Sequence, residues 1–424
     1  MELKKYKKKR ITPQGWKEIT LAEVFNTSSG ATPLSTEASY YENGTIPWIN
    51  SGELASPYIY DTTNFISQAG FENSSTEIYP IDTVLVAMYG ATAGKASLLK
   101  MEACTNQAIC AILPNKDYSS TFLKYSIDTL YDHLVGLSSG SARDNLSQAE
   151  LKKLKLIMPP TKNEQNKLVS ILASIDRKIE LNQAINQNLE AMAKQLYDYW
   201  FVQFDFPNEE GKPYKSSGGN MVWNEKLKRN IPIGWNNGTL IDIANITMGQ
   251  SPDGTSYNEI GEGVLFYQGS TDFGIRFPSV RQYTTAPSRF AKKGDILMSV
   301  RAPVGAVNIA NNDCCIGRGL SALNSKIGST THLYYILNDL RIAFDQRNAA
   351  GTTFGSITKE DLYNLPIVIP AKEVISAFDK ICSPMFDRQM LLGEEIDTLI
   401  KQRDELLPLL LNGQVLVNSD LSAH

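Results

Sequence analysis

Residues 10–16 read Arg-Ile-Thr-Pro-Gln-Gly-Trp, and residues 229–235 read Arg-Asn-Ile-Pro-Ile-Gly-Trp. The arginine, proline, glycine and tryptophan therefore recur at an offset of 219 residues. Residues 30–33, Gly-Ala-Thr-Pro, match residues 249–252, Gly-Gln-Ser-Pro, at the same offset. One shared dipeptide would be noise, but several identities at one offset predict an internal repeat almost half as long as the chain.

The repeat continues toward the C-terminus of each copy. There the offset falls to 211, as a few deleted loop residues would require, and the matching positions are Gly94 with Gly305, Cys104 with Cys315, Gly140 with Gly351, Pro159 with Pro370, and Asp176-Arg177 with Asp387-Arg388. Each copy therefore includes more than its opening motif, and we expect two similar domains.

The first part of each copy has the pattern of short strands joined by turns. Residues 84–88 and 296–300 are apolar runs of strand length, each followed by a turn-rich loop. Near the end of this part, Ser147 with Glu150, and Thr358 with Asp361, have the spacing of a helix capping box. These features predict a hairpin-rich α+β domain in each copy.

The second part of each copy is predicted to be a long helix. Residues 163–200 contain no proline or glycine, and apolar residues recur at heptad spacing: Leu168, Ile171, Ile175, Ile185, Leu189, Met192, Leu196 and Tyr199. Because such a stripe needs a partner, we expect the helices of the two copies to form an antiparallel coiled-coil pair about a pseudo-twofold axis. Pro384 is expected to start a new helical segment or to kink the second helix.

The expected fold class is α+β, with two repeated β-rich domains separated by two long antiparallel helices. The boundaries place the first β-rich domain at 1–160, a central helix and linker at 161–215, the second β-rich domain at 216–371, and a C-terminal helix at 372–424. Residues 209–219 are polar and rich in Gly and Ser, as a linker should be. The aromatic run at 197–206 is interpreted as a plug that packs a helix end, with a partner-binding patch as the alternative.

Composition excludes several classes of protein. The 424 residues are 42% hydrophobic and 20% charged, which is typical of a globular protein with several cores. No apolar run of membrane-spanning length occurs, and no apolar segment follows the basic residues 1–10, so we expect a cytoplasmic protein that does not enter a membrane. The net charge of −4 gives no support by itself to a nucleic-acid partner.

The chain also lacks the motifs of a catalytic or cofactor site. Five cysteines form no Cys-x-x-Cys and only three histidines occur, so no metal site is expected. Residues 89–96 resemble a phosphate-binding loop but have Tyr89 where glycine, and Ala96 where serine or threonine, is required. Residues 158–161 lack the acidic or amide residue that precedes Pro-Pro in amino-methyltransferases. We therefore expect no cofactor and no catalysis by this chain.

Taken together, the motifs resemble those of the specificity (S) subunit of type I restriction-modification enzymes, over nearly the whole chain. The resemblance rests on the motif at residues 11–16, which is repeated at 231–235, and on the motifs at 30–33 and 89–95. It also rests on Pro159-Pro160 followed by Glu164-Gln165. The second copy departs from the pattern, with Arg-Ala-Pro-Val-Gly at 301–305 and Ile375-Ser376 in place of Glu-Gln.

The resemblance implies a function in DNA recognition. Each β-rich domain would be a target recognition domain that reads one half of a split double-stranded DNA site, and the helices would act as spacer and docking surface. The implied partners are two methyltransferase subunits, which carry S-adenosylmethionine and flip an adenine in each half-site, and restriction subunits. The chain itself would catalyse nothing.

Loop positions differ between the copies, whereas scaffold positions recur, so the two domains are expected to read different sequences. We select loop residues that could bond to base edges or phosphates: Thr32, Lys95, Ser139, Ser141, Arg143 and Asn145 in the first domain, and Gln250, Ser251, Arg301, Arg318, Thr352 and Thr353 in the second. Arg143 and Asn145, in a polar loop, are the strongest pair.

Two other classes of function stay open at this point. A two-lobed, non-catalytic scaffold could bind a protein or carbohydrate through the same loops, and it would show no sequence preference on DNA. A nuclease or methyltransferase with an unrecognised site would show turnover by the purified chain alone.

Overall fold

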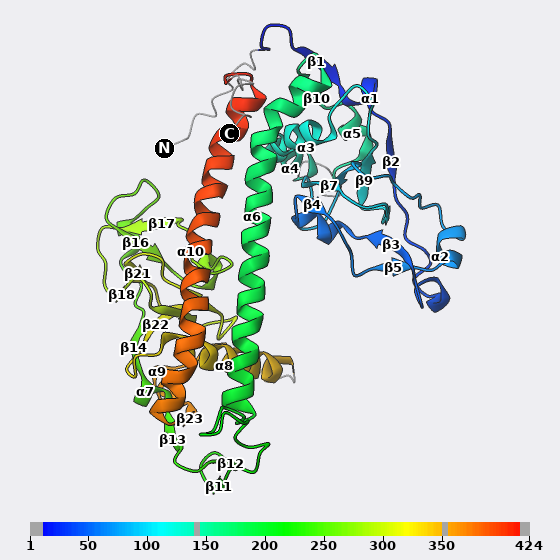
Figure 1. Ribbon diagram of the computed structural model, residues 1–424. Helices are drawn as coiled ribbons and strands as arrows, with labels where there is room; N and C mark the ends of the chain where they lie inside the picture. Colours follow the sequence, from blue (N-terminus) through cyan, green and yellow to red (C-terminus); the bar gives the residue numbers. More distant parts are fainter. Residues whose placement is uncertain (1–11, 140–144, 350–354, 416–424) are drawn as a thin grey trace. The chain divides into compact units, whose positions relative to one another are not determined.

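The computed structural model describes residues 12–139, 145–349 and 355–415. These residues form two compact units: the described residues up to 179 together with those from 398 onward make one, and the described residues from 180 to 397 make the other. Each unit thus contains a segment of both long helices, α6 (Lys162–Tyr197) and α10 (Lys372–Leu411), drawn in green and in orange to red in Figure 1. The fold class is α+β, as predicted.

Ten short strands and five short α-helices, besides two 3-10 helices, lie in the described part of the first unit. They are β1 Lys17–Thr20, α1 Leu21–Val24, β2 Thr27–Ser29, β3 Ile46–Ile49, β4 Tyr58–Ile59, β5 Phe65–Ile66, α2 Gln68–Glu72, β6 Val84–Ala87, β7 Ala96–Leu99, β8 Cys104–Thr105, β9 Ile109–Ile112, α3 Ser120–Asp128, α4 Tyr131–Ser139, α5 Gln148–Lys152 and β10 Lys155–Met158. The main sheet has the order β2-β9-β6-β7-β4, and smaller sheets are formed by β5-β3-β8 and β1-β10.

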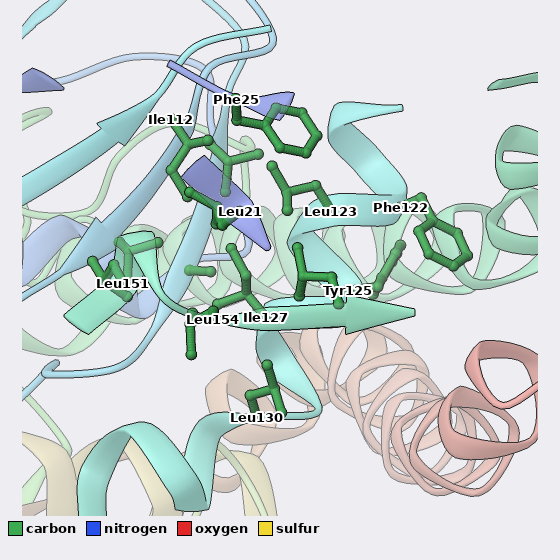
Figure 2. Close-up of a cluster of buried hydrophobic side chains, with 14 of the residues drawn as sticks. Leu21, Phe25, Ile112, Phe122, Leu123, Tyr125, Ile127, Leu130, Leu151 and Leu154 are labelled. Atoms are coloured by element: carbon green, nitrogen blue, oxygen red, sulfur yellow. The ribbon is translucent and has the colours of Figure 1, made fainter. Parts of the chain in front are cut away.

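The core of the first unit lies where α1, α3 and α5 pack against the main sheet. Figure 2 shows Leu21 of α1, Ile112 of β9 and the side chains of α3 meeting there. The N-terminal half of α6 contributes Leu168 and Leu172, and α10 contributes Leu410. Every side chain of β6 and β9 is buried, which explains the continuous apolar runs in these strands.

The second unit repeats this plan with additions. Its elements are β11 Met221–Asn224, β12 Arg229–Pro232, β13 Asn236–Thr239, α7 Leu240–Ile243, β14 Ala244–Met248, β15 Tyr257–Asn258, β16 Val264–Tyr267, β17 Gln282–Thr284, β18 Phe290–Ala291, β19 Ile296–Ser299, β20 Val307–Ile309, β21 Cys314–Ile316, β22 Leu320–Ser325, α8 Thr330–Ala349, α9 Lys359–Tyr363 and β23 Pro366–Ile369. The sheets have the orders β14-β22-β19-β20, β15-β17-β16-β21-β18, β13-β23 and β11-β12.

Several local predictions are confirmed. The apolar runs form β6 and β19, and the capping boxes of Ser147 and Thr358 start α5 and α9. The aromatic run is a plug, because Tyr197, Trp200, Phe201, Phe204 and Phe206 are all buried in the core of the second unit. That placement disfavours the alternative of a partner-binding patch.

The predicted seam of α6 is partly wrong. Ile171, Ile185, Met192 and Tyr199 are 37–54% exposed, whereas polar Asp176, which lies outside the predicted seam, is 2% exposed. Asn182, a polar position within the predicted seam, is buried at 1% exposed. These two polar side chains are buried because each meets a partner on α10. The prediction that Pro384 starts a new helical segment is also wrong, because α10 continues without a break from Lys372 to Leu411.

Candidate nucleic-acid interface

Three loops leave the same end of the main sheet in the first unit. Strand β9 is antiparallel to β2 and to β6, with Cys110 opposite Ser29 and Ile109 opposite Ala87. The segments 30–33, 88–95 and 106–108 must therefore meet at that end, and we call them the first loop edge. Residue 146 joins them, because its main-chain N–H donates to the carbonyl of Met88 at 2.8 Å.

The polar side chains of the first loop edge are mostly uncharged. The Thr32 hydroxyl donates a hydrogen bond to Oε1 of Gln107, and both residues are exposed. Beside them the Asn106 amide donates to Oδ1 of Asn50 at 3.2 Å. Lys95 is the exposed cation at the end of the 88–95 loop. Such a surface offers both donors and acceptors to a ligand.

The second unit has a corresponding edge. Strand β22 is antiparallel to β14 and β19, with Ser321 opposite Met248 and Leu320 opposite Ser299. The segments 249–252, 300–306 and 317–319 therefore meet at one end of this sheet, and we call them the second loop edge. Residue 357 joins the second loop edge, because its main-chain N–H donates to the carbonyl of Val300 at 2.9 Å. Residue 146 joins the first loop edge in the same way.

Ser251 is the centre of the second loop edge. Its hydroxyl oxygen accepts from the main-chain N–H of Arg318 at 3.2 Å and from Nε of Arg318 at 3.4 Å. It also accepts from Nε2 of Gln268 at 3.0 Å. In the part of the chain that the structure describes, no carboxylate lies within ion-pair distance of Arg318 or Arg301, both of which are exposed. This edge is therefore cationic, unlike the Thr32–Gln107 pair.

The two edges have the same backbone framework. The N–H of Ala31 donates to the carbonyl of Thr105 at 3.0 Å, and Gln250 donates to Ile316 at 3.0 Å. The next residues along the chain, Asn106 and Gly317, also make equivalent bonds. The main-chain N–H of Asn106 donates to the carbonyl of Ile49 at 3.0 Å, and that of Gly317 donates to the carbonyl of Tyr267 at 2.8 Å. The repeat offsets thus identify positions that are equivalent in space within each unit.

Gly30 and Gly249 allow this close approach of loop and strand. A Cβ on Gly30 would lie 2.0 Å from the carbonyl oxygen of Thr105, and a Cβ on Gly249 would lie 2.1 Å from that of Gly317. Both distances are far inside van der Waals contact with backbone atoms, which cannot rotate away as a side chain could.

We expect Gly249→Ala to destabilise the second unit by about 1–3 kcal/mol, because the Cβ forces loop and strand apart. The same shift should displace Ser251 from Arg318. Urea unfolding of the full chain measures the change, with Gly254→Ala as the matched control, since no atom lies within 4 Å of a Cβ there. Equal stability of the two variants would contradict the packing role of Gly249.

The structure places half of the sequence-predicted residues on the two edges. Thr32 and Lys95 belong to the first, and Gln250, Ser251, Arg301 and Arg318 belong to the second. Asn145 directly precedes residue 146, which bonds to Met88. Ser139 is the last residue of α4, and its side chain is not described. Ser141, Arg143, Thr352 and Thr353 lie outside the described residues.

Two edge residues were not selected from the sequence. Gln107 is equivalent to Arg318, so the repeat offset was a sufficient signal to find it. Gln268 contacts Ser251 from the end of β16, seventeen positions along the chain. No motif marks Gln268, and only the packing of strand ends brings it to Ser251.

Metal-ligand clusters and ionised thiols are two kinds of group that active sites use. No group of three or more His, Cys, Asp or Glu side chains in them could hold a metal ion. Burial raises the pKa of the thiols of Cys110 and Cys382 to about 12, so both are protonated near neutral pH. Within the same residues, no helix is both long and apolar enough to cross a membrane.

Comparison with protein families matches the two copies of the repeat separately. The family of the type I restriction modification DNA specificity domain matches residues 13–191 and 232–387. The chain belongs to this family. The specificity domain therefore occurs twice, and each match includes one loop edge and part of one long helix.

Relatives of this specificity protein have similar length. The type I restriction enzyme MjaIX specificity subunit of Methanocaldococcus jannaschii is 28% identical over 96% of this chain and 94% of its own. A putative type I MjaX specificity subunit from the same organism is 32% identical over 65% of this chain and 63% of its own. The crystal structure of a type I S subunit from M. genitalium has the same fold, with a TM-score of 0.60, 16% identity and coverage of 93% of this chain and 96% of that one.

Proposed function

We propose that this specificity subunit reads an asymmetric, two-part site on double-stranded DNA, one part with each loop edge. The observation that carries the proposal is that equivalent positions have different side chains. Thr32 and Gln107 occupy the positions of Ser251 and Arg318, and Lys95 occupies the position of Ala306. A protein with two identical readers would select a palindrome, whereas two different readers select two different half-sites.

The long helices are proposed to form the spacer between the readers as an antiparallel coiled-coil pair with pseudo-twofold symmetry. Contacts inside the second unit support this, because Asn182 bonds to Glu395 whereas Asn186, further along α6, accepts from Gln389, earlier in α10. At about 1.5 Å per residue, the 36 residues of α6 span about 54 Å, which exceeds one DNA turn of about 34 Å. The helix length therefore permits a gap of non-contacted base pairs.

The chain is proposed to be non-catalytic and to act in the cytoplasm within a larger enzyme. In this proposal, two methyltransferase subunits dock on it, bind S-adenosylmethionine and modify an adenine in each half-site, and restriction subunits join for cleavage. The 1–160 and 216–371 domains read DNA, and the 161–215 and 372–424 segments hold them apart. The membership of both halves in the specificity-domain family supports this division of roles.

The deciding experiment co-expresses the chain with a methyltransferase subunit of its system and maps methylated adenines across DNA of random sequence. We expect a split, asymmetric motif that is present only when this chain is present. Methylation that is absent, or that is the same without the chain, would refute the proposal and favour a scaffold function. Turnover by the purified chain alone would refute its non-catalytic role.

A further inference from the structure

Positions 107 and 318 are equivalent in the repeat but differ in chemistry. Each follows the residue whose main-chain N–H crosses to the neighbouring strand, Asn106 in one unit and Gly317 in the other. Each is also held by a hydroxyl from its own unit, that of Thr32 or that of Ser251. A side chain that is exposed yet held in orientation is suited to reading a ligand, because little rotamer freedom is left to lose on binding.

Gln107 is held with its amide in a defined direction. The Thr32 hydroxyl donates to Oε1, so one lone pair of that oxygen is used and the second remains available. No hydrogen bond of Nε2 with another described residue is found. The exposed carboxamide therefore presents one donor and one acceptor side by side. That pair is complementary to N7 and N6 of adenine in the major groove.

The side chain of Arg318 is held at Nε rather than at its two terminal nitrogens. Nε and the main-chain N–H both point to the Ser251 hydroxyl, at 3.4 and 3.2 Å. Within the described chain, its two terminal nitrogens have neither a carboxylate nor a carbonyl partner. Arg281, in the same unit, is by contrast paired with Asp272. Two parallel, unpaired donors are complementary to O6 and N7 of guanine.

We infer that 107 and 318 are equivalent base-reading positions, with Gln107 selecting an adenine in one half-site and Arg318 selecting a guanine in the other. The inference rests on the proposed function and makes it specific. Thr32 and Ser251 are positioning residues, since each orients the reading side chain and is not required to touch the base.

The test exchanges the two readers in the complex of the full chain with its methyltransferase subunits. Binding selection from a random double-stranded library gives the base preference at every position. We expect Arg318→Gln to change one position of one half-site from guanine toward adenine, by about 10-fold or more in relative binding. Gln107→Arg should change one position of the other half-site in the opposite direction.

Two further variants separate base reading from charge. Arg318→Lys keeps the cation but loses the planar fork, so the guanine preference should fall while the salt dependence of binding stays the same. Lys292→Gln removes an exposed cation at the opposite end of the sheet, where Asp295 meets Asn324, and should leave the selected sequence unchanged.

The outcomes are distinguishable. If Arg318→Gln weakens binding equally on all sequences, Arg318 contacts a phosphate and the inference is wrong. The inference is also wrong if Arg318→Gln leaves the base preference unchanged. It is wrong as well if the base positions that respond to the two substitutions are neither adenine nor guanine in the site selected by the parent complex. A complex that selects no sequence before any substitution would instead refute the proposed function itself.

Discussion

Arg403→Met is expected to destabilise the first unit by about 3 kcal/mol, because it leaves the carboxylate of Asp176 buried without its cation. Asp176 is 2% exposed, and its two oxygens accept from the Tyr125 hydroxyl at 2.5 Å and from Nη1 of Arg403 at 3.2 Å. Tyr125 in turn lies 3.1 Å from the hydroxyl of Tyr58. The network thus joins α6 and α10 to α3 and β4 of the same unit.

The expected loss of folding free energy lies at the lower end of the range for breaking a buried ion pair. Asp176 and Arg403 both line a cavity of about 350 Å³, so water can partly hydrate the Asp176 carboxylate that remains. The side chain of Arg403 is also 27% exposed, which weakens the attraction that is lost. Without these two features, a loss closer to 5 kcal/mol would be expected.

Hydrogen exchange of the α3 and α6 amides in the full chain measures this change. A loss of about 3 kcal/mol corresponds to opening that is about 100-fold more frequent. Asp404→Asn is the matched control, because it removes the other, 58% exposed, carboxylate partner of Arg403 and should cost under about 1 kcal/mol. Equal effects of the two substitutions would show that Asp176 does not depend on Arg403.

The same network explains why the helical seam was the weakest part of the sequence prediction. Heptad spacing places Ile171, Ile185 and Met192 in the seam, yet these side chains are exposed, and the helix buries Asp176, which lies outside the seam. A buried polar residue is recognisable only when its partner is known, and the partner Arg403 lies more than 200 positions away. Hydrophobic pattern alone therefore placed part of the buried stripe on the wrong face.

The loop edges were predictable for the opposite reason. Strands β6 and β19 and the capping boxes of α5 and α9 depend on neighbours within a few residues, so local sequence identifies them. The repeat then supplied the long-range information, since a position that matters in one copy has an equivalent in the other. Gln268 has no such signal, because its role arises where the residue after β16 meets the loop after β14, and these strands belong to different sheets.

Helix α8 was also not anticipated, and it contains the titratable group with the clearest pH dependence. His332 is 2% exposed, and its ring centroid lies 4.5 Å from that of Phe201. Within the described part of the chain, its Nδ1 has no hydrogen-bond partner. Burial lowers the pKa of His332 from 6.5 to about 4, because the imidazolium cannot be hydrated in this aromatic core.

We expect acid to destabilise the second unit through this histidine. Between pH 6.5 and about 4 the unfolded chain binds a proton on His332 that the folded chain does not, so stability falls as the pH decreases. The contribution is fully present above about pH 6.5, and its loss reaches about 3 kcal/mol near pH 4, since each pKa unit is worth about 1.4 kcal/mol.

The measurement compares urea unfolding of the chain with that of His332→Phe between pH 4 and 7.5. Carboxylates titrate in both proteins and cancel, so the difference in unfolding free energy between variant and parent should shift in favour of the variant by about 3 kcal/mol from neutral to acidic pH. The control is Tyr335→Phe in the same helix, which should give a difference that does not vary with pH, because burial raises the pKa of the Tyr335 hydroxyl and it does not titrate in this range. A constant difference for His332→Phe as well would mean that the folded chain protonates this histidine, and that water or a rearranged partner reaches Nδ1 within the core.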